Sequence, residues 1–238
     1  TYGSKSTKWV TELDCLFRWL GKGVPNCIIL DILDFSSLPF MFKRKRKGIF
    51  EDTYIVAIGN YLRVPSWIDV CINPYSTSRF DSKRTLKKVS RKYSIISDDF
   101  LRYRQMLNGR AIRTSGKRVF VLAGGGNTQG LIFKILEAFR NLPVRCSIDI
   151  IIGGFFTDKE RLKTRLAQLN HKVRLWQNIS PRIVAKLMTQ ADLGILSYGR
   201  SLDEARSLGL PCIVLSSSRL NHLGSVRAER QGGIVYLG

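Results

Sequence analysis

The chain has 238 residues, of which 44% are hydrophobic, so it is long enough for one large or two small domains and too apolar to be disordered. Its net charge of +21 would attract phosphate-bearing ligands, nucleic acid or an anionic membrane face, but the charge alone does not distinguish between these partners. No apolar run reaches the roughly 18 residues of a membrane-spanning helix, and the first ten residues lack the apolar core of a signal peptide, so we expect a cytoplasmic protein.

The first half of the chain indicates an α/β unit with an irregular pattern. The expected elements, in order, are a helix over 13–20, strands over 26–33, 53–58 and 67–72, a loop or surface helix over 76–91, a strand over 91–96 and a helix over 98–107. The basic, glycine-containing segment 108–118 is typical of a linker. We therefore predict a partial N-terminal domain over 1–116 and a second domain over 117–238.

The second half alternates strands and helices throughout. The expected strands are 119–123, 146–152, 173–176, 193–196, 212–215 and 234–237. The expected helices are 131–142, 158–169, 181–190 after an N-capping Ser180, 202–208 and 220–231. Because these strands are apolar on both faces, we predict a parallel sheet covered by helices on both sides. In such a sheet, ligands bind at the carboxyl ends of the strands.

A glycine turn follows the first of these strands. Gly124, Gly125, Gly126 and Asn127 lead into a helix whose free N–H groups and dipole would suit a phosphate. The turn has neither the Gly-Lys-Ser/Thr of a P-loop nor the usual register of Gly-x-Gly-x-x-Gly. A tight turn with no ligand explains the pattern equally well, so this turn alone does not decide the function.

A second loop, containing Gly199, follows the strand at 193–196. We expect a short helix from about Ser201, and its N-terminus could receive a diphosphate. Glu204, in the first turn of that helix, could accept hydrogen bonds from ribose hydroxyls. Ser201 and Glu204 also have the Ser-x-x-Glu spacing of a capping box, and the spacing taken alone favours that interpretation.

Two further positions could carry chemistry. Asn221 and His222 are expected at the start of the next helix, where they could reach a sugar, although a single histidine there is more often a surface residue. Asp31 and Asp34 end an apolar strand and could do acid–base work, although Asp34 could simply cap the next segment. The catalytic candidates are therefore Asp31 and His222.

The cysteines and the basic run have simpler interpretations. Cys27, Cys71 and Cys212 lie in apolar runs, no Cys-x-x-Cys pair occurs, and the chain has 2 histidines, so we expect buried thiols and no metal site. The run 43–47 is all Lys and Arg, which favours a solvated turn over a patch that docks on an anionic membrane. No nucleic-acid-binding module is recognised, which argues against a nucleic-acid partner.

The segment from Asp192 to Gly238 resembles the C-terminal domain of MurG-like (GT-B) glycosyltransferases. It is most similar to their relatives, the UDP-sugar hydrolase of pseudaminic acid synthesis (PseG) and the spore-coat polysaccharide protein SpsG. The segments 121–127, 68–73 and 93–100 are similar to a glycine turn and two upstream segments of that family. The resemblance implies an α/β, GT-B-like fold of two Rossmann-like domains facing a cleft, with the N-terminal domain incomplete here.

The resemblance also implies a ligand and its contacts. A nucleotide-sugar, in this family a UDP-sugar, would lie on the C-terminal domain, with Glu204 at the ribose, Ser201, Leu202 and the glycine turn at the diphosphate, and Asn221 near the sugar. The predicted ligand-binding residues are Gly124, Gly125, Gly126, Asn127, Gly199, Ser201, Leu202, Glu204 and Asn221. No metal and no further cofactor is implied.

The sequence departs from the family at positions that matter for catalysis. The family's Gly-x-Gly-His-x-x-Arg motif, whose histidine is thought to be the general base, does not occur in this sequence. The aspartate of the glycine turn is Asn127 here, and the family's Asn-Gln pair is Asn221-His222. The sequence thus supports binding better than catalysis. It leaves open a hydrolase, a transferase, an inactive nucleotide-sugar-binding homologue and, from the charge alone, a nucleic-acid-binding protein.

Overall fold

A computed structural model describes two units of the chain. It covers residues 26–31, 35, 51–59, 61, 63–74, 79–81, 83–89, 91–107, 117–123, 129–216 and 218–238. The contacts divide the chain into a first unit, Thr1–Ser94, and a second unit, Ile95–Gly238. Each unit is described by itself.

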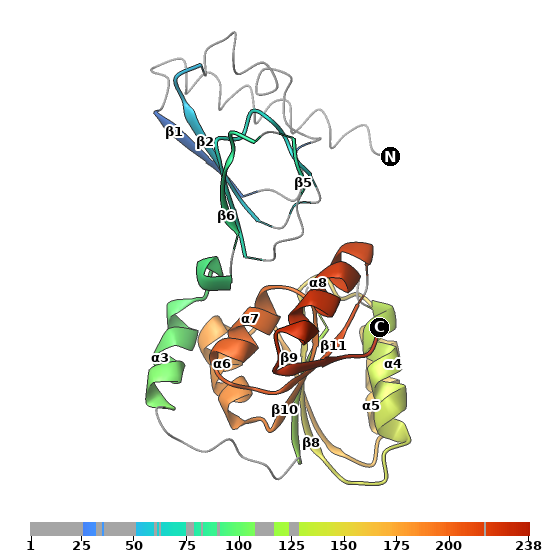
Figure 1. The fold of residues 1–238 in the computed structure, drawn as a ribbon. Coiled ribbons are helices and arrows are strands. Elements are labelled where there is room, and N and C mark those ends of the chain that lie inside the picture. Colours follow the sequence, from blue (N-terminus) through green and yellow to red (C-terminus); the bar gives the residue numbers. More distant parts are fainter. Residues whose placement is uncertain are drawn as a thin grey trace. The chain divides into compact units, whose positions relative to one another are not determined.

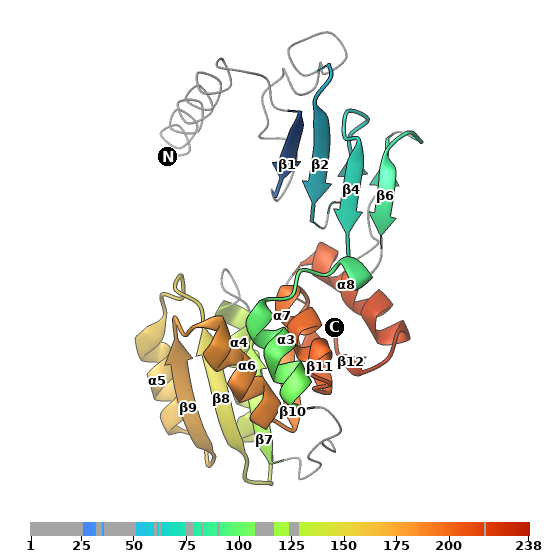
Figure 2. The same ribbon diagram turned by 90° about the vertical axis from the view of Figure 1, so that its left-hand side faces the viewer.

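The first unit contains a four-stranded parallel sheet (Figure 2). Its strands, in spatial order, are β1 (Cys27–Leu30), β2 (Tyr54–Ile58), β4 (Val70–Asn73) and β6 (Leu86–Val89). The short strands β3 (Arg63–Val64) and β5 (Arg79–Phe80) form a second, two-stranded parallel sheet. The core of the unit is built from buried apolar side chains, which are Leu30, Phe35, Ile55, Ala57, Tyr61, Val64, Ile68 and Cys71.

Two predictions for the first unit are wrong. The segment 76–91, predicted as a loop or surface helix, contains β5 and the edge strand β6, whose exposed Lys87 and Lys88 hide its strand character in the sequence. The segment 91–96, predicted as a strand, begins with the 3₁₀ helix η2 (Arg91–Tyr93) and continues without strand pairing. The predicted helix over 13–20 lies outside the described residues.

The second unit is a six-stranded parallel sheet with the spatial order β12-β11-β10-β7-β8-β9. The strands are β7 (Arg118–Leu122), β8 (Ser147–Ile152), β9 (Lys172–Gln177), β10 (Leu193–Ser197), β11 (Cys212–Leu215) and β12 (Ile234–Tyr236). The helices are α3 (Asp98–Met106), α4 (Gln129–Arg140), α5 (Lys159–Ala167), α6 (Pro181–Gln190), α7 (Arg200–Ser207) and α8 (Arg219–Arg230). Every strand and helix predicted after residue 117 is confirmed, including the Ser180 cap, whose Oγ accepts from the N–H of Ile183.

Helices cover both faces of this sheet, as the apolar strands predict. On one face, Ile148 and Ile150 of β8 pack with Ile132 and Leu136 of α4 and with Leu162 of α5. On the opposite face lie α6 and α7, with α3 against them (Figures 1 and 2). The chain therefore crosses from one side of the sheet to the other between β9 and β10.

The division between the units differs from the predicted boundary at 116/117. Helix α3 belongs to the second unit because it packs on α6 and α7. Its start is fixed locally by Ser97, whose Oγ accepts from the N–H of Asp99. Most of the predicted linker over 108–118 lies outside the described residues. None of the helices that the structure describes is long and apolar enough to cross a membrane.

Candidate functional site

The order of the strands in the second unit marks one place on the sheet for a ligand. Strands β7 and β10 are neighbours, and the chain continues outward from them in opposite directions, through β8 and β9 on one side and β11 and β12 on the other. Helices α4 and α7 follow these two strands on opposite faces. Such a topological switch point is where open parallel sheets bind ligands. The predicted turn over 124–127 follows β7 but lies outside the described residues, so its role stays a prediction.

The loop after β10 turns into α7 through a glycine that no other residue can easily replace. Gly199 has φ 150° and ψ −160°, a conformation essentially restricted to glycine. The carbonyl of Gly199 accepts from the N–H of Leu202 at 3.0 Å, and the Leu202 side chain is buried in the core. The preceding first-turn amides, those of Arg200 and Ser201, have no partner within a helix and are the donors best placed for an anion.

The capping-box interpretation of Ser201 and Glu204 is wrong. Helix α7 begins at Arg200, its N-cap is Gly199, and no side chain caps it. Ser201 is therefore inside the helix rather than before it. The predicted start, at 201 or 202, was late because glycine at an N-cap gives a weaker sequence signal than serine.

Glu204 is half-buried at the start of the second turn of α7, rather than in the first turn as predicted. Burial raises the pKa of its carboxyl group, Arg200 acts in the opposite direction, and Asp203 raises it further. A carboxylate that has lost part of its hydration gains from hydrogen-bond donors that replace the water. Glu204 is therefore suited to accept from the hydroxyl groups of a bound molecule.

The first turn of α8 supplies polar groups at the same edge of the sheet. Ser218 caps the helix, its Oγ accepting from the N–H of Asn221 at 3.2 Å. The carbonyl of Asn221 accepts from Ser225 Oγ at 2.7 Å, and Ser225 Oγ lies 3.3 Å from Ser216 Oγ in the loop after β11. Asn221, predicted to lie near a sugar, is thus held in place through its backbone at the start of α8.

His222 is tied to the last strand. Its Nδ1 and the hydroxyl of Tyr236 in β12 are hydrogen-bonded at 2.6 Å, and the two rings are 5.6 Å apart. Glu229 Oε1 accepts from the N–H of Tyr236, a second link between α8 and β12. Because Nδ1 is engaged, Nε2 is the ring nitrogen of His222 left for a ligand. No local sequence pattern predicts this pairing, because the partners are 14 residues apart.

The other predicted positions belong to the first unit or lie outside the described residues. Asp31 follows β1 in the first unit and is exposed, while Asp34 and the run 43–47 lie outside the described residues. The described residues contain no group of three or more His, Cys, Asp or Glu that could hold a metal. Cys71 and Cys212 are buried as predicted, but Cys27 is exposed, because it lies on the edge strand β1.

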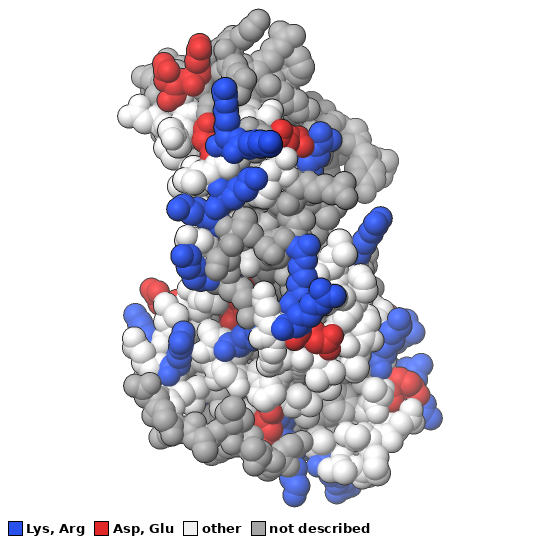
Figure 3. Space-filling model, in the orientation of Figure 1, with Lys and Arg blue, Asp and Glu red and all other residues white. Residues whose placement is uncertain are grey.

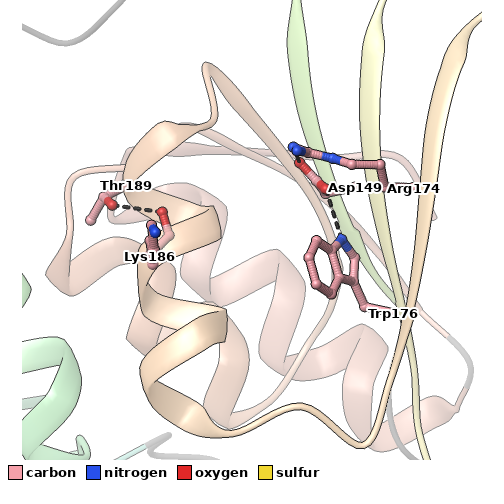
Figure 4. A network of polar contacts seen from close by, with 5 residues as sticks. All are labelled: Asp149, Arg174, Trp176, Lys186 and Thr189. Carbon is pink, nitrogen blue, oxygen red and sulfur yellow. Dashed lines mark hydrogen bonds and ion pairs between the residues drawn. The ribbon is translucent and has the colours of Figure 1, made fainter.

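A separate polar network joins the outer strands β8 and β9 (Figure 4). Asp149 accepts from Arg174 Nη2 at 2.6 Å and from Trp176 Nε1 at 2.8 Å. Asp149 and Arg174 are direct partners in the strand register, so the network is a cross-strand pair extended by one indole. On α6, the hydroxyl of Thr189 donates to the carbonyl of Lys186, a bond within the helix. We interpret both sets of contacts as structural.

The basic charge is dispersed over the described surface. In the view of Figure 3, Lys and Arg side chains are scattered over both units and several acidic side chains lie among them. Ion pairs such as Arg140–Glu137 and Lys163–Glu160 are exposed and each contributes little to stability. On the face shown in Figure 3, the described Lys and Arg side chains form no single basic groove of the kind that tracks a nucleic acid.

Sequence comparison finds relatives that match between half and three fifths of the chain. No family model matches. The spore coat polysaccharide biosynthesis protein SpsG of Bacillus subtilis is 29% identical over 124 residues, which are 51% of this chain and 36% of SpsG. An uncharacterised protein of Methanocaldococcus jannaschii is 27% identical over 142 residues, 59% of this chain and 29% of that protein. The chain thus spans about a third of the length of each relative, and the predicted similarity to SpsG is confirmed.

Structural comparison establishes the fold class. MurG of Acinetobacter baumannii matches with a TM-score of 0.60 and 11% identity over 92% of this chain and 62% of MurG. The UDP-GlcNAc 2-epimerase of Methanocaldococcus jannaschii, solved with UDP-GlcNAc and UDP, matches with a TM-score of 0.59 and 16% identity over 100% of this chain and 71% of the epimerase. The predicted GT-B-like α/β fold is confirmed.

Proposed function

We propose that the chain binds a nucleotide-sugar, specifically a UDP-sugar, at the switch point of the second unit. We further propose that it acts in the synthesis of a cell-surface polysaccharide or nonulosonic acid, as a hydrolase or a glycosyltransferase. The observation that carries the proposal is Glu204, a half-buried carboxylate one turn into a helix that begins at the switch point. The similarity to SpsG and the fold shared with proteins of UDP-sugar chemistry support it.

Each part of the ligand has a complementary group in this proposal. The first-turn amides of α7, at Arg200 and Ser201, receive the diphosphate, because a helix N-terminus favours an anion. Glu204 accepts from the ribose hydroxyls and regains the hydrogen bonds that burial removes. Asn221 and His222, at the start of α8, face the sugar. The predicted glycine turn over 124–127 completes the diphosphate site.

Titration calorimetry with UDP and UDP-GlcNAc tests the proposal. Wild type is expected to bind both, and Glu204→Ala is expected to weaken each about tenfold or more, since losing a charged acceptor costs roughly 1.5–3 kcal/mol. Glu160→Ala is the matched control, because it removes an exposed carboxylate on α5. Wild type that binds neither ligand, or equal binding by wild type and Glu204→Ala, contradicts the proposal.

A second assay separates hydrolysis from transfer. A hydrolase releases UDP and free sugar from its UDP-sugar with no acceptor present, whereas a transferase requires the acceptor. If the protein binds UDP-sugars and releases nothing under either condition, the inactive homologue is the better interpretation. DNA retention that falls with salt, without affinity for UDP-sugars, would instead favour a nucleic-acid-binding protein.

We also propose that the protein works in the cytoplasm beside an anionic membrane face, which the net charge of +21 would attract. The contact would be made by the run Lys43-Arg44-Lys45-Arg46-Lys47. Pelleting with vesicles that contain anionic lipid tests this, and neutralising the five residues should abolish the pelleting. Equal pelleting of the neutralised protein would remove this part of the proposal.

A further inference from the structure

Tyr198 is buried even though it lies in the loop between β10 and α7. Along β10 the alternate residues Gly194 and Leu196 are buried, and Tyr198 continues this alternation past the end of the strand. Its side chain is 8% exposed. Because Gly199 then turns the chain sharply into α7, Tyr198 is the last side chain that the loop directs into the protein.

The ring of Tyr198 lies directly on α8, at a position where the helix has no side chain. A Cβ added to Gly224 would overlap Cε1 and Cζ of Tyr198 and would lie 2.7 Å from its Oη. Carbon atoms in ordinary contact are about 3.5–4.0 Å apart, so a methyl group here requires the ring or the helix to move by about 1 Å. By contrast, a Cβ on Gly130 in α4 would meet nothing within 4 Å.

We propose that Tyr198 is a positioning residue that fixes the spacing between the α7 N-terminus and the first turns of α8; this inference rests on the proposed function. Tyr198 is adjacent to Gly199, which caps α7. Gly224 follows Asn221 by three residues, about one helical turn, so the two lie on neighbouring positions of the same helix face. The contact between ring and glycine therefore joins the diphosphate side of the site to the sugar side.

Helix α8 is also held from its other side. His222 and Glu229 both bond to Tyr236, in β12. Because these bonds fix α8, a side chain added at Gly224 should push Tyr198 and the loop after β10 away from the helix. The distance between this loop and the polar groups of Asn221 would then change. A UDP molecule would contact the α7 side alone, whereas a UDP-sugar must fit both sides. The contact should thus affect UDP-sugar binding more than UDP binding.

Calorimetry with UDP and UDP-GlcNAc on four variants tests the inference. Gly224→Ala and Tyr198→Ala should each weaken UDP-GlcNAc about tenfold while changing UDP less than about threefold. The control Glu160→Ala, at an exposed position of α5, should change neither. In the double variant, Gly224→Ala should cost nothing beyond Tyr198→Ala, because the added methyl group then meets no ring.

The outcomes separate this inference from the proposed function. Equal losses for UDP and UDP-GlcNAc, or additive losses in the double variant, overturn the positioning role and leave UDP-sugar binding standing. If Gly224→Ala does not fold, Tyr198→Ala decides, and an unchanged ratio of the two affinities overturns the role. Wild type that binds neither ligand removes the proposed function and this inference together.

Discussion

Asp192 should be one of the residues on which the stability of the second unit depends most. It precedes β10, is 6% exposed, and its Oδ2 accepts from the N–H groups of Lys117 and Arg118 at 3.1 and 3.0 Å. Its own N–H donates to the carbonyl of Arg118 at 2.8 Å. One side chain thus fixes the beginnings of both central strands, which are parallel neighbours in the sheet.

The cost of Asp192→Ala follows from these bonds. A hydrogen bond to a charged group is worth roughly 1.5–3 kcal/mol, and the two amides lose the same acceptor. Because Lys117 is exposed, water can replace the acceptor for its amide. We therefore expect a loss of about 2–4 kcal/mol, a large part of the roughly 5–15 kcal/mol that stabilises a typical domain.

Guanidinium unfolding of the second unit, followed by circular dichroism and by the fluorescence of Trp176, measures this loss. Asp192→Asn keeps one acceptor oxygen and should fall between wild type and Asp192→Ala. Glu160→Ala, on the exposed face of α5, should remain within about 0.5 kcal/mol of wild type. A loss below about 0.5 kcal/mol for Asp192→Ala would refute the reasoning, because the bonds to the two amides would then contribute nothing net.

Three more predictions concern the same unit and the thiols. Gly199→Ala should destabilise by about 1–3 kcal/mol through its backbone conformation alone, since a Cβ there meets nothing within 4 Å; the unfolding midpoint measures it. Burial raises the folded pKa of Glu204, so the ionised carboxylate destabilises the folded state relative to the neutral form. This effect is absent below the unfolded pKa of about 4.3 and develops as the pH rises through the folded pKa. Glu204→Gln should therefore raise the thermal midpoint at pH 7 but not at pH 4. Iodoacetamide should label the exposed Cys27 in the native protein before it labels Cys71 and Cys212, because burial raises the pKa values of these two thiols to about 11 and about 12. Peptide mass spectrometry measures the extent of labelling at each cysteine, and equal labelling of the three would contradict the prediction.

The sequence predicted the second unit better than the first for a physical reason. Strands buried between two helical layers must be apolar on both faces, so segments such as Cys146–Ile152 stand out in the sequence. An edge strand has no such requirement. In β6, Lys87 and Lys88 are exposed and follow Thr85 and Leu86, so the sequence of this segment has the polar character of a surface loop. Strand propensity and hydrophobic periodicity therefore predict secondary structure poorly at positions whose side chains are not constrained by packing.

The candidate site shows the same division between local and distant determinants. Asn221 and the start of α8 could be located because Ser218 is a recognisable cap. The start of α7 could not, because a glycine in an unusual conformation caps it. The contacts of Tyr198 with Gly224 and of His222 with Tyr236 join segments far apart along the chain, and no pattern of spacing predicts them.

The ion pair between Asp149 and Arg174 has a consequence for solubility. Among the described residues, strand β9 pairs with β8 alone, so its outer edge carries backbone groups that another chain could pair with. Lys172 and Arg174 lie on the same face of β9, where Lys172 is exposed and Arg174 is paired with Asp149 of the neighbouring strand β8. An incoming strand would have to strip water from both cations before it formed its first hydrogen bonds. The cations of β9 therefore help to protect this edge against sheet-to-sheet aggregation.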